Sequence, residues 1–454
     1  MQLDRLFDPG GIAVIGASAT AGKLGHEAMR SAARFDGPVY PVNPNGEGEL
    51  FGEPFRPSVG AIDGPVDLAL LAVPPAAVPE VLEECGDAGL GAAIVYAGGF
   101  AETDAEGAAV QAELAQVARE HELAVLGPNT SGYAVPSREL YLSFASPMTD
   151  VGPGNLAVIA QSGGVAHTAA FQGTLEGLGF SAVVGLGNRA VTGFEPVVEY
   201  FDGDPATDAI LLHVEGADDA RGLLESCRAA ETPVAALHVG QADVDEFATS
   251  HTGALTGDHA LYEAGFRQYG AQPVESTAEL LDAGQVLAEA PAPAGQRVGV
   301  VTAQAGPGLI IADRLRAAGV PLPSLADETV SRLEELLPGI TYIENPVDTA
   351  RPIGTFDTVI ETVADDPTID ALIVYQLYEP PLEFPVDTLR DLTEQLPVVF
   401  ASSGPTEAFE DDLVELREAG VPAYRSPERG ADALRMLVEH AKIESPPAAV
   451  VAGD

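Results

Sequence analysis

One histidine stands in a setting that could support phosphate chemistry. His251 lies within Thr-Ser-His-Thr-Gly-Ala-Leu-Thr-Gly at 249–257. An imidazole nitrogen can act as a nucleophile, and small neighbours suit a residue that must move and contact phosphate. Composition alone equally allows an ordinary loop histidine beside a Ser/Thr turn. We interpret the other seven histidines as structural: His26, His121, His167, His213, His238, His259 and His440.

Two further segments are expected near this loop. Ser162, Gly163 and Gly164 follow an apolar, strand-like run and open a helix-like segment, and Glu215 directly follows the run Ala-Ile-Leu-Leu-His-Val. The first N–H groups of a helix lack intrahelical partners, so small residues there provide a place for phosphate. Ligands gather at the carboxyl ends of strands in an open parallel sheet, which is where all these segments are predicted to lie.

A glycine-rich loop near the start of the chain is a second candidate anion site. The run Gly-Ala-Ser-Ala-Thr-Ala-Gly-Lys-Leu-Gly at 16–25 follows Ile-Ala-Val-Ile and opens a helix. The alternative is a tight strand-to-helix turn without a ligand. Lys23 stands out because the only other lysine is Lys442. A dinucleotide site would need an acidic residue after the second strand, where Asn43 and Pro44 stand, so NAD is disfavoured.

The elements that must position these residues form three blocks of alternating strand and helix, which predicts parallel sheets covered on both faces. The expected strands are 11–16, 38–42, 68–73, 92–97 and 124–127; then 156–160, 182–187, 209–214 and 233–239; then 297–303, 371–377 and 397–403. The predicted organisation is a Rossmann-like domain (1–128), a connector (129–154), a flavodoxin-like domain (155–289), a linker (290–295), a second flavodoxin-like domain (296–445) and a flexible tail (446–454).

The second and third blocks begin alike. Val-Ile-Ala-Gln-Ser-Gly-Gly-Val starts at 158, and Val-Val-Thr-Ala-Gln-Ala-Gly-Pro-Gly starts at 300. Both are interpreted as a strand, a glutamine, a small residue and a glycine before a helix. This short internal repeat is compatible with two flavodoxin-like domains in tandem.

Composition excludes several classes of protein. The 454 residues contain 69 Asp and Glu against 22 Lys and Arg, a net charge of −47, so no basic surface for nucleic acid is expected. The acidic residues are dispersed, which predicts a surface adapted to high salt. No apolar run reaches the about 20 residues of a membrane span, and the first residues do not resemble a signal peptide. Two cysteines supply neither a disulfide framework nor a metal site, so a soluble cytoplasmic protein is expected.

The first block resembles the CoA-binding domain of ADP-forming acetyl-CoA synthetases and of succinyl-CoA synthetase α subunits. The shared motifs are I-A-V-I-G-A-S…G-K-L-G, Y-P-V-N-P, V-D-L-A-L-L-A-V-P, E-E-C-G, A-G-G-F-A-E and G-P-N. The family usually has a lysine after Asn-Pro, where this chain has Asn45. The resemblance implies that the CoA phosphates contact Gly16, Ser18, Lys23 and Gly25, and that the pantetheine and adenine path follows Asn43, Pro44, Val73, Pro74 and Pro75.

The middle block resembles the same family at its catalytic motifs. Ser-His-Thr-Gly-Ala-Leu-Thr-Gly resembles the phosphohistidine loop, which makes His251 the phosphorylated residue. Gln-Ser-Gly-Gly is similar to the phosphate-binding helix start, and Glu-Gly-Ala-Asp-Asp-Ala-Arg matches the segment whose glutamate, here Glu215, orients the histidine. A carboxylate on one ring nitrogen fixes the tautomer and leaves the other nitrogen nucleophilic.

The resemblance covers nearly the whole chain and implies an NDP-forming acyl-CoA synthetase α subunit of haloarchaeal type. Acyl-CoA and phosphate would give an acyl phosphate and CoA, and His251 would then carry the phosphoryl group to ADP. No phosphate-binding loop of the form G-x-x-x-x-G-K-[ST] occurs, and the sequence ends at Asp454 without an ATP-grasp domain. The resemblance therefore implies an ATP-grasp β subunit that holds ATP or ADP with Mg²⁺, in a hetero-oligomer. The remaining substrates would be a small carboxylic acid and phosphate.

Departures from the family pattern keep an alternative open. The segment before the His251 loop, at 240–248, carries no cation where the family has a basic stretch, and Val191-Thr192 stands where the family has an aspartate. These departures favour a regulatory CoA-binding protein of the same fold, whereas the retained Ser162, Glu215 and His251 favour the enzyme. Neither the acyl group nor the choice between ADP and GDP follows from the sequence.

Overall fold

A computed structural model describes residues 3–239, 259–339, 341–351, 354–380 and 382–444 of the chain. His251 and the predicted tail at 446–454 lie outside these residues. The chain divides into two compact units, residues 1–281 and 282–454. Across the described ranges, no helix is both long and apolar enough to cross a membrane.

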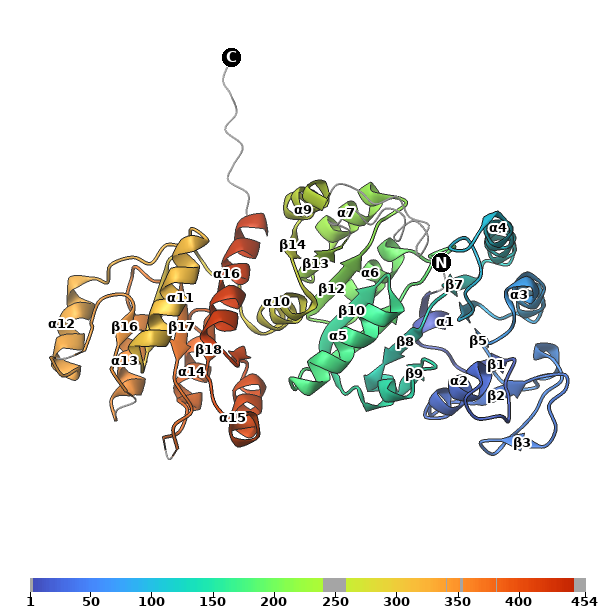
Figure 1. Cartoon of the computed structure of the whole chain (residues 1–454), viewed down its shortest axis with the longest axis horizontal. Coiled ribbons are helices and arrows are strands. Elements are labelled where there is room, and N and C mark those ends of the chain that lie inside the picture. Colours follow the sequence, from blue (N-terminus) through green and yellow to red (C-terminus); the bar gives the residue numbers. More distant parts are fainter. Residues whose placement is uncertain (1–2, 240–258, 340, 352–353, 381, 445–454) are drawn as a thin grey trace, which may run out of the picture. The chain divides into compact units, whose positions relative to one another are not determined.

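Five parallel strands form the first sheet, as the sequence predicts (Figure 1). They are β1 (Ile12–Ile15), β2 (Val39–Val42), β5 (Leu68–Leu71), β6 (Ala92–Val95) and β7 (Ala124–Leu126), in the order β2-β1-β5-β6-β7. The strands are runs of buried aliphatic residues, which suits a sheet with helices on both faces. Its helices are α1 (Leu3–Phe7), α2 (Leu24–Ala32), α3 (Val78–Asp87) and α4 (Ala105–Glu120), and a small hairpin pairs β3 (Glu49–Leu50) with β4 (Glu53–Pro54).

The second sheet also belongs to the first unit and has seven strands in the order β14-β13-β12-β10-β11-β8-β9. The parallel strands are β10 (Pro153–Ala160), β11 (Phe180–Gly185), β12 (Ala209–Val214), β13 (Val234–His238) and β14 (Ala271–Val274). The helices between and after them are α5 (Gly163–Leu175), α6 (Phe194–Asp202), α7 (Ala220–Ala229), α9 (His259–Gln268) and α10 (Thr277–Glu289).

Two strands of this sheet come from the segment predicted as a connector. β8 (Gly132–Val135) pairs antiparallel with β11, and β9 (Leu140–Leu142) pairs antiparallel with β8. Every residue of both strands is buried. An unpaired edge strand would expose a row of backbone polar groups, and this hairpin covers the edge of β11. The connector therefore contributes to the fold of the second sheet.

The third sheet lies in the second unit and is entirely parallel, in the order β16-β15-β17-β18-β19. Its strands are β15 (Val298–Thr302), β16 (Val347–Asp348), β17 (Ala371–Tyr375), β18 (Val398–Ala401) and β19 (Ala423–Tyr424). Its helices are α11 (Ala305–Ala317), α12 (Asp327–Leu336), α13 (Phe356–Ala364), α14 (Val386–Thr393), α15 (Thr406–Glu418) and α16 (Pro427–Glu444), with α11 and α16 side by side (Figure 1).

The short repeat seen in the sequence corresponds to a shared contact at the strand ends. Gln161 follows β10, and its side-chain oxygen accepts the N–H groups of Glu215 at 3.0 Å and Gly216 at 3.2 Å, just after β12. Gln304 follows β15, and its side-chain oxygen accepts the N–H of Leu377 at 3.0 Å, just after β17. In both sheets a glutamine thus joins the ends of two neighbouring parallel strands.

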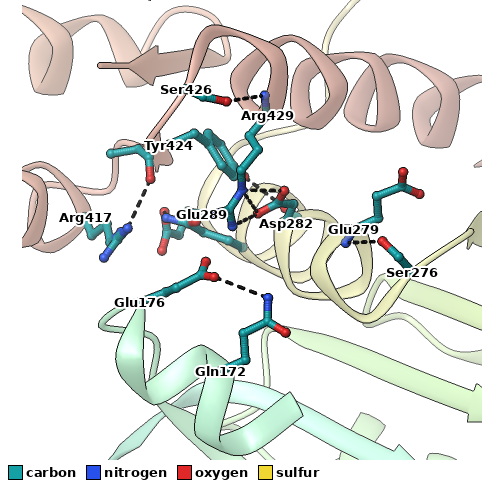
Figure 2. Close-up of polar contacts among 12 residues, drawn as sticks. Gln172, Glu176, Ser276, Glu279, Asp282, Glu289, Arg417, Tyr424, Ser426 and Arg429 are labelled. Atoms are coloured by element: carbon teal, nitrogen blue, oxygen red, sulfur yellow. Dashed lines mark hydrogen bonds and ion pairs between the residues drawn. The ribbon is translucent and has the colours of Figure 1, made fainter. Parts of the chain in front are cut away.

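A buried ion pair lies within the second unit, which begins at Asp282 in the middle of α10 (Figure 2). Arg429 on α16 donates from Nε and Nη2 to the two carboxylate oxygens of Asp282, at 3.0 and 2.5 Å. The Tyr424 hydroxyl donates to the Asp282 carbonyl at 2.9 Å. The Asp282 side chain is only 5% exposed, so removing its partner would leave a buried charge, which is strongly destabilising.

Candidate functional site

A cavity of about 240 Å³ opens where the strand ends of the first two sheets meet within the first unit. It is lined by residues that follow six different strands. These are Tyr96 after β6, Asn129, Thr130 and Ser131 after β7, Phe144 after β9, Gln161 to Gly164 after β10, Gly187 and Asn188 after β11, and Glu215 after β12. The structure therefore brings together Ser162, Gly163, Gly164 and Glu215, four of the predicted site residues.

The beginning of α5 forms one wall of the cavity. Ser162 is the N-cap residue, but its side chain makes no capping hydrogen bond. A Cβ added at Gly163 would lie 2.5 Å from the Ser131 hydroxyl oxygen, so packing requires glycine there. At Gly164 the nearest such atom is the Ser162 hydroxyl oxygen at 3.7 Å, an ordinary contact. Packing thus leaves room at Gly164, beside N–H groups that suit an anion.

Glu215 also lines the cavity, and hydrogen bonds to Gln161 hold its backbone in place. Its N–H and that of Gly216 donate to Gln161, whose own N–H donates to the His213 carbonyl at 3.0 Å. Because Gln161 is almost fully buried, both hydrogen bonds are shielded from water. The backbone after β12 is therefore hydrogen-bonded to Gln161, the residue between the end of β10 and the start of α5.

The segment after β7 supports the floor of the cavity. The Thr130 hydroxyl donates to the Gly185 carbonyl and accepts the Gly132 N–H at 2.9 Å. Asn129 has a positive φ of 58° and donates its N–H to the Ala97 carbonyl at 2.8 Å. This segment thus connects the ends of β6 and β7 to the end of β11.

Asn188 is the polar link between the two sheets at this point. Its side-chain amide donates to Glu102 at 2.5 Å and to Gln111 at 3.0 Å. Glu102 also accepts the N–H groups of Gly99 at 2.6 Å and Phe100 at 3.2 Å. Burial alone would raise the pKa of Glu102, but these hydrogen bonds outweigh it and lower that pKa. Glu102 is therefore an ionised anchor for the segment after β11.

Two aromatic side chains form an apolar side of the cavity. The rings of Tyr96 and Phe144 meet edge to face with centroids 5.8 Å apart. Burial raises the pKa of the Tyr96 hydroxyl, which donates to the Leu142 carbonyl at 2.9 Å. Phe144 is 37% exposed, so part of its ring is available for contact. The cavity thus has the start of α5 on one side and two aromatic rings on another.

The predicted CoA-contacting residues follow three neighbouring strands of the first sheet. Gly16 follows β1, Asn43 and Pro44 follow β2, and Val73, Pro74 and Pro75 follow β5. Since β1 lies between β2 and β5, the three segments share one edge of the sheet at its topological switch point. The Asn43 side chain donates to the Ala17 carbonyl at 2.8 Å, which joins the first two segments. The structure therefore brings these residues to one place.

The glycine loop itself shows which positions are fixed by packing. A Cβ at Gly25 would lie 2.1 Å from the Gly16 carbonyl, so this glycine allows the helix to approach the strand. Gly22 has a positive φ of 83° and no atom within 4 Å of an added Cβ, and its N–H donates to Glu27 at 2.8 Å. The Ser18 hydroxyl accepts the Thr20 N–H at 3.1 Å. Lys23 is exposed at the N-cap of α2.

The surroundings of the His251 loop are partly described. His238 ends β13 immediately before the undescribed residues and stacks on Tyr262 with ring centroids 4.0 Å apart. Its Nδ1 lies 3.1 Å from Nδ1 of His259, where the described chain resumes. Burial lowers the pKa of both His213 and His238 to about 4, so both rings are neutral near pH 7. Neutral stacked rings are expected of structural histidines.

Several residues that line the cavity are not among the site residues predicted from the sequence. Asn129 and Gln161 belong to motifs noted in the sequence, Gly-Pro-Asn and Gln-Ser-Gly-Gly, and Asn188 lies within Gly-Asn-Arg at 187–189. Tyr96 and Phe144 carry no local signal, because an aromatic residue after a strand is equally compatible with ordinary core packing. Only the joining of the two sheets places them in the same cavity as the start of α5.

Protein-family models match two segments of the chain. Residues 11–136 match a model described as a CoA binding domain. Residues 153–287 match a model described as a succinyl-CoA ligase like flavodoxin domain. The first match contains the glycine loop, and the second contains Ser162, Glu215 and His251.

Relatives and solved structures match almost the whole chain. The α subunits of ADP-forming acetate–CoA ligases I and II of Pyrococcus furiosus are 34% and 33% identical to it, over 97% of this chain and 98% of each subunit. The structure is similar to that of the dinucleotide forming acetyl-coenzyme A synthetase 1 of Ca. Korarchaeum cryptofilum in its apo form, with a TM-score of 0.88, 28% identity and coverage of 98% of both chains. The same synthetase in complex with phosphate and ADP gives a TM-score of 0.87, with 29% identity and coverage of 98% of this chain and 97% of that one.

Proposed function

This chain belongs to the family of α subunits of ADP-forming acyl-CoA synthetases, and on that premise we propose that His251 carries the phosphoryl group of the reaction. The overall reaction interconverts acyl-CoA, ADP and phosphate with a carboxylic acid, CoA and ATP. The observation that carries the assignment of the site is the convergence of Ser162, Gly164 and Glu215 on one cavity. The relatives are ligases, so a purely regulatory CoA-binding protein is not favoured.

The proposed relay has three balanced steps. A phosphate oxygen attacks the thioester carbonyl carbon, the carbon–sulfur bond breaks, and CoA leaves as the thiol with one proton. A nitrogen of His251 then attacks the phosphorus of the acyl phosphate, and the carboxylate leaves. ADP finally takes the phosphoryl group from the histidine and becomes ATP. Throughout these steps the N–H groups at the start of α5 would stabilise the phosphoryl oxygens.

Glu215 would act on the histidine rather than on phosphate. Its backbone N–H donates to Gln161, and the residue lines the cavity. A carboxylate that accepts a hydrogen bond from one ring nitrogen would leave the other nitrogen free to attack phosphorus. We assign Glu215 the role of orienting His251, which itself lies outside the described residues.

Coenzyme A would bind along the strand ends of the first sheet. The residues there fit its phosphates, because Gly16 and Gly22 have positive φ, Gly22 has open space around it, and Lys23 is exposed beside the loop. A phosphate that takes the Gly22 N–H would displace the Glu27 carboxylate. Val73 lies beside Gly16 and would guide the pantetheine chain toward Tyr96 and the cavity. The acyl group would face the aromatic side formed by Tyr96 and Phe144.

The nucleotide site is proposed to lie on a partner. The similar Pyrococcus furiosus chains are named as α subunits, and this sequence contains no phosphate-binding loop of the Walker type. We therefore assign ATP or ADP and Mg²⁺ to an ATP-grasp β subunit, and the active form to a hetero-oligomer.

A reconstitution experiment tests the proposed function. The chain is mixed with an ATP-grasp β subunit of this family and supplied with acetyl-CoA, ADP, Mg²⁺ and inorganic phosphate. ATP and free CoA should appear in equal amounts, and omission of either protein should abolish both products. Binding of acetyl-CoA without any ATP under these conditions would instead support the regulatory protein.

A further inference from the structure

A serine in the segment after β7 carries a hydroxyl group that the fold does not use. Ser131 lines the cavity, as do Ser162 and Gly164. It is only 7% exposed, and its hydroxyl oxygen is buried without a hydrogen-bond partner among the described residues. A buried hydroxyl that forms no hydrogen bond lowers the stability of a folded protein. The presence of this hydroxyl therefore requires a reason other than folding.

The neighbouring residue, Thr130, shows what a structural hydroxyl does in this segment. The Thr130 hydroxyl donates to the Gly185 carbonyl and accepts the Gly132 N–H at 2.9 Å. It both donates and accepts a hydrogen bond within the protein, and these bonds hold the segment after β7 against the end of β11. The Ser131 hydroxyl makes no such contact in the part of the chain that the structure describes. It is therefore not needed to hold the backbone at this point.

Ser131 lies directly beside the start of α5. A Cβ added at Gly163 would lie 2.5 Å from the Ser131 hydroxyl oxygen and 3.1 Å from its backbone nitrogen. A Cβ added at Gly185 would also lie 2.5 Å from that oxygen. The hydroxyl thus stands between the first residue of α5 and the last residue of β11. It is consequently next to the N–H groups of a helix start, which suit an anion.

An anion at the start of α5 is the partner that this hydroxyl fits. Neither lysine nor arginine occurs among the described residues that line the cavity, so phosphate binding there depends on N–H and O–H donors. A hydrogen bond to a charged acceptor is stronger than one between neutral groups. The Ser131 hydroxyl can turn toward a ligand by rotation about the Cα–Cβ bond, without movement of the backbone. It can therefore donate to a phosphate oxygen.

We propose that Ser131 is a further phosphate-binding residue: its hydroxyl donates a hydrogen bond to an oxygen of inorganic phosphate at the start of α5. The role rests on the proposed function, because it requires phosphate to bind there. Without phosphate the buried hydroxyl lowers the stability of the chain, and bound phosphate removes this cost by accepting the hydrogen bond. Part of the affinity for phosphate thus comes from a donor that the folded chain leaves unsatisfied.

Ser131→Ala tests this role, because it removes the hydroxyl oxygen and little else. In the reconstituted enzyme, KM for inorganic phosphate should rise about tenfold, as expected for the loss of one hydrogen bond to a charged group, while KM for acetyl-CoA changes less than about twofold. Without phosphate, the thermal unfolding midpoint of the variant should exceed that of the wild type by about 2 °C, because an unsatisfied hydroxyl is gone. Added phosphate should raise the midpoint of the wild type more than that of the variant.

Ser31→Ala is the matched control. Ser31 on α2 is 2% exposed, and its hydroxyl is likewise buried without a partner in the described ranges, but it is not among the described residues that line the cavity. This variant should show a similar rise in the unfolding midpoint and an unchanged KM for phosphate.

Three results for Ser131→Ala would overturn the inference. They are an unchanged KM for phosphate, equal losses for all substrates, and a lower unfolding midpoint or loss of folding, which would mean that the structure needs the hydroxyl. A wild type that forms no ATP would instead contradict the proposed function. In that case the effect of phosphate on the two unfolding midpoints still decides whether Ser131 binds phosphate.

Discussion

Gly163 and Gly164 are neighbours in the chain, but the space available for a side chain differs between them. An added Cβ at Gly163 would lie 2.5 Å from the Ser131 hydroxyl oxygen, whereas at Gly164 it would meet nothing closer than 3.7 Å. Packing therefore explains why residue 163 is a glycine. It does not explain Gly164, for which we infer that phosphate binding is the reason. This difference between the two residues gives a test of phosphate binding at the start of α5.

Gly163→Ala and Gly164→Ala should separate stability from binding. Gly163→Ala should lower the free energy of unfolding by about 1 to 3 kcal/mol, because the new methyl group overlaps Ser131. Gly164→Ala should leave that free energy unchanged or slightly higher, since alanine favours a helix over glycine, but KM for phosphate should rise several-fold. Urea unfolding and phosphate titration measure the two effects. Equal KM values for wild type and Gly164→Ala would show that phosphate does not bind at the start of α5.

At the scale of elements, the strand ends are joined by a recurring glutamine contact. Gln161 connects β10 to the residues after β12, and Gln304 connects β15 to the residue after β17. A side-chain amide oxygen can accept two N–H groups, so one residue fixes both the end of its own strand and the start of the neighbouring loop. In the second sheet that loop carries Glu215, which makes the contact important for the site.

Replacement of Gln161 should affect both folding and the position of Glu215. Gln161→Leu leaves the N–H groups of Glu215 and Gly216 without an acceptor, and it should lower the free energy of unfolding by about 1 to 3 kcal/mol. Gln161→Glu keeps an acceptor oxygen and should retain more stability, but its extra negative charge should raise KM for phosphate. Chemical denaturation and steady-state kinetics distinguish the two. Equal stability of wild type and Gln161→Leu would show that the hydrogen bonds are dispensable.

The sequence predicts the strands within apolar runs well and several of the remaining strands poorly. Runs such as Ala-Ile-Leu-Leu-His-Val identify β12 by themselves, and all five strands of the first sheet follow from such runs. By contrast, β8, β9 and β14 lie among Pro- and Gly-containing neighbours that hide them, although they are no shorter than the strands of the first sheet. Their pairing is decided by the exposed edges of longer strands, which no local pattern reports.

Some residues of the candidate site are likewise predicted from the sequence, and others are not. Ser162, Gly164 and Glu215 are predicted from the sequence because glycine, hydroxyl and carboxylate groups directly after strands have few structural reasons to be there. Tyr96 and Phe144 are not, because aromatic residues are common in cores and only the joining of two sheets gives them a shared cavity.

At the scale of the molecule, one carboxyl group couples the second unit to pH. Burial raises the pKa of Glu289 from its ordinary 4.5 to about 7, against the opposing effects of Arg417 and Gln285. The folded state therefore favours the protonated acid. Its contribution to stability is complete below about pH 4.5 and is lost as pH rises through about 7.

Glu289→Gln should flatten this pH dependence. Between pH 5 and 8 the wild type should lose about 1 to 3 kcal/mol of unfolding free energy relative to the variant, whose amide does not titrate. Denaturant unfolding of the second unit at several pH values measures the difference. Glu394→Gln, at an exposed position of the same unit, is the control and should parallel the wild type. If the unfolding free energy of Glu289→Gln changes with pH in parallel with that of the wild type, Glu289 does not titrate in the predicted range.

The net charge of −47 predicts a dependence on salt. Like charges dispersed over a surface repel one another, and ions screen the repulsion over a shorter distance as their concentration rises. The midpoint of thermal unfolding should therefore increase between 0.1 and 2 M KCl by about 5 °C or more. Sucrose at matched viscosity should not reproduce the increase if charge screening is the cause. An unfolding midpoint that is independent of KCl would contradict adaptation of this surface to high salt.

Phosphorylation of His251 is the most direct test of the relay. The chain is incubated with acetyl phosphate labelled in its phosphoryl group, alongside His251→Ala and Glu215→Gln. The wild type should acquire an acid-labile, base-stable label that mass spectrometry places on His251, His251→Ala should acquire none, and Glu215→Gln should react more slowly. A label of the same size on folded His251→Ala, or a label on another residue of the wild type, would contradict the account.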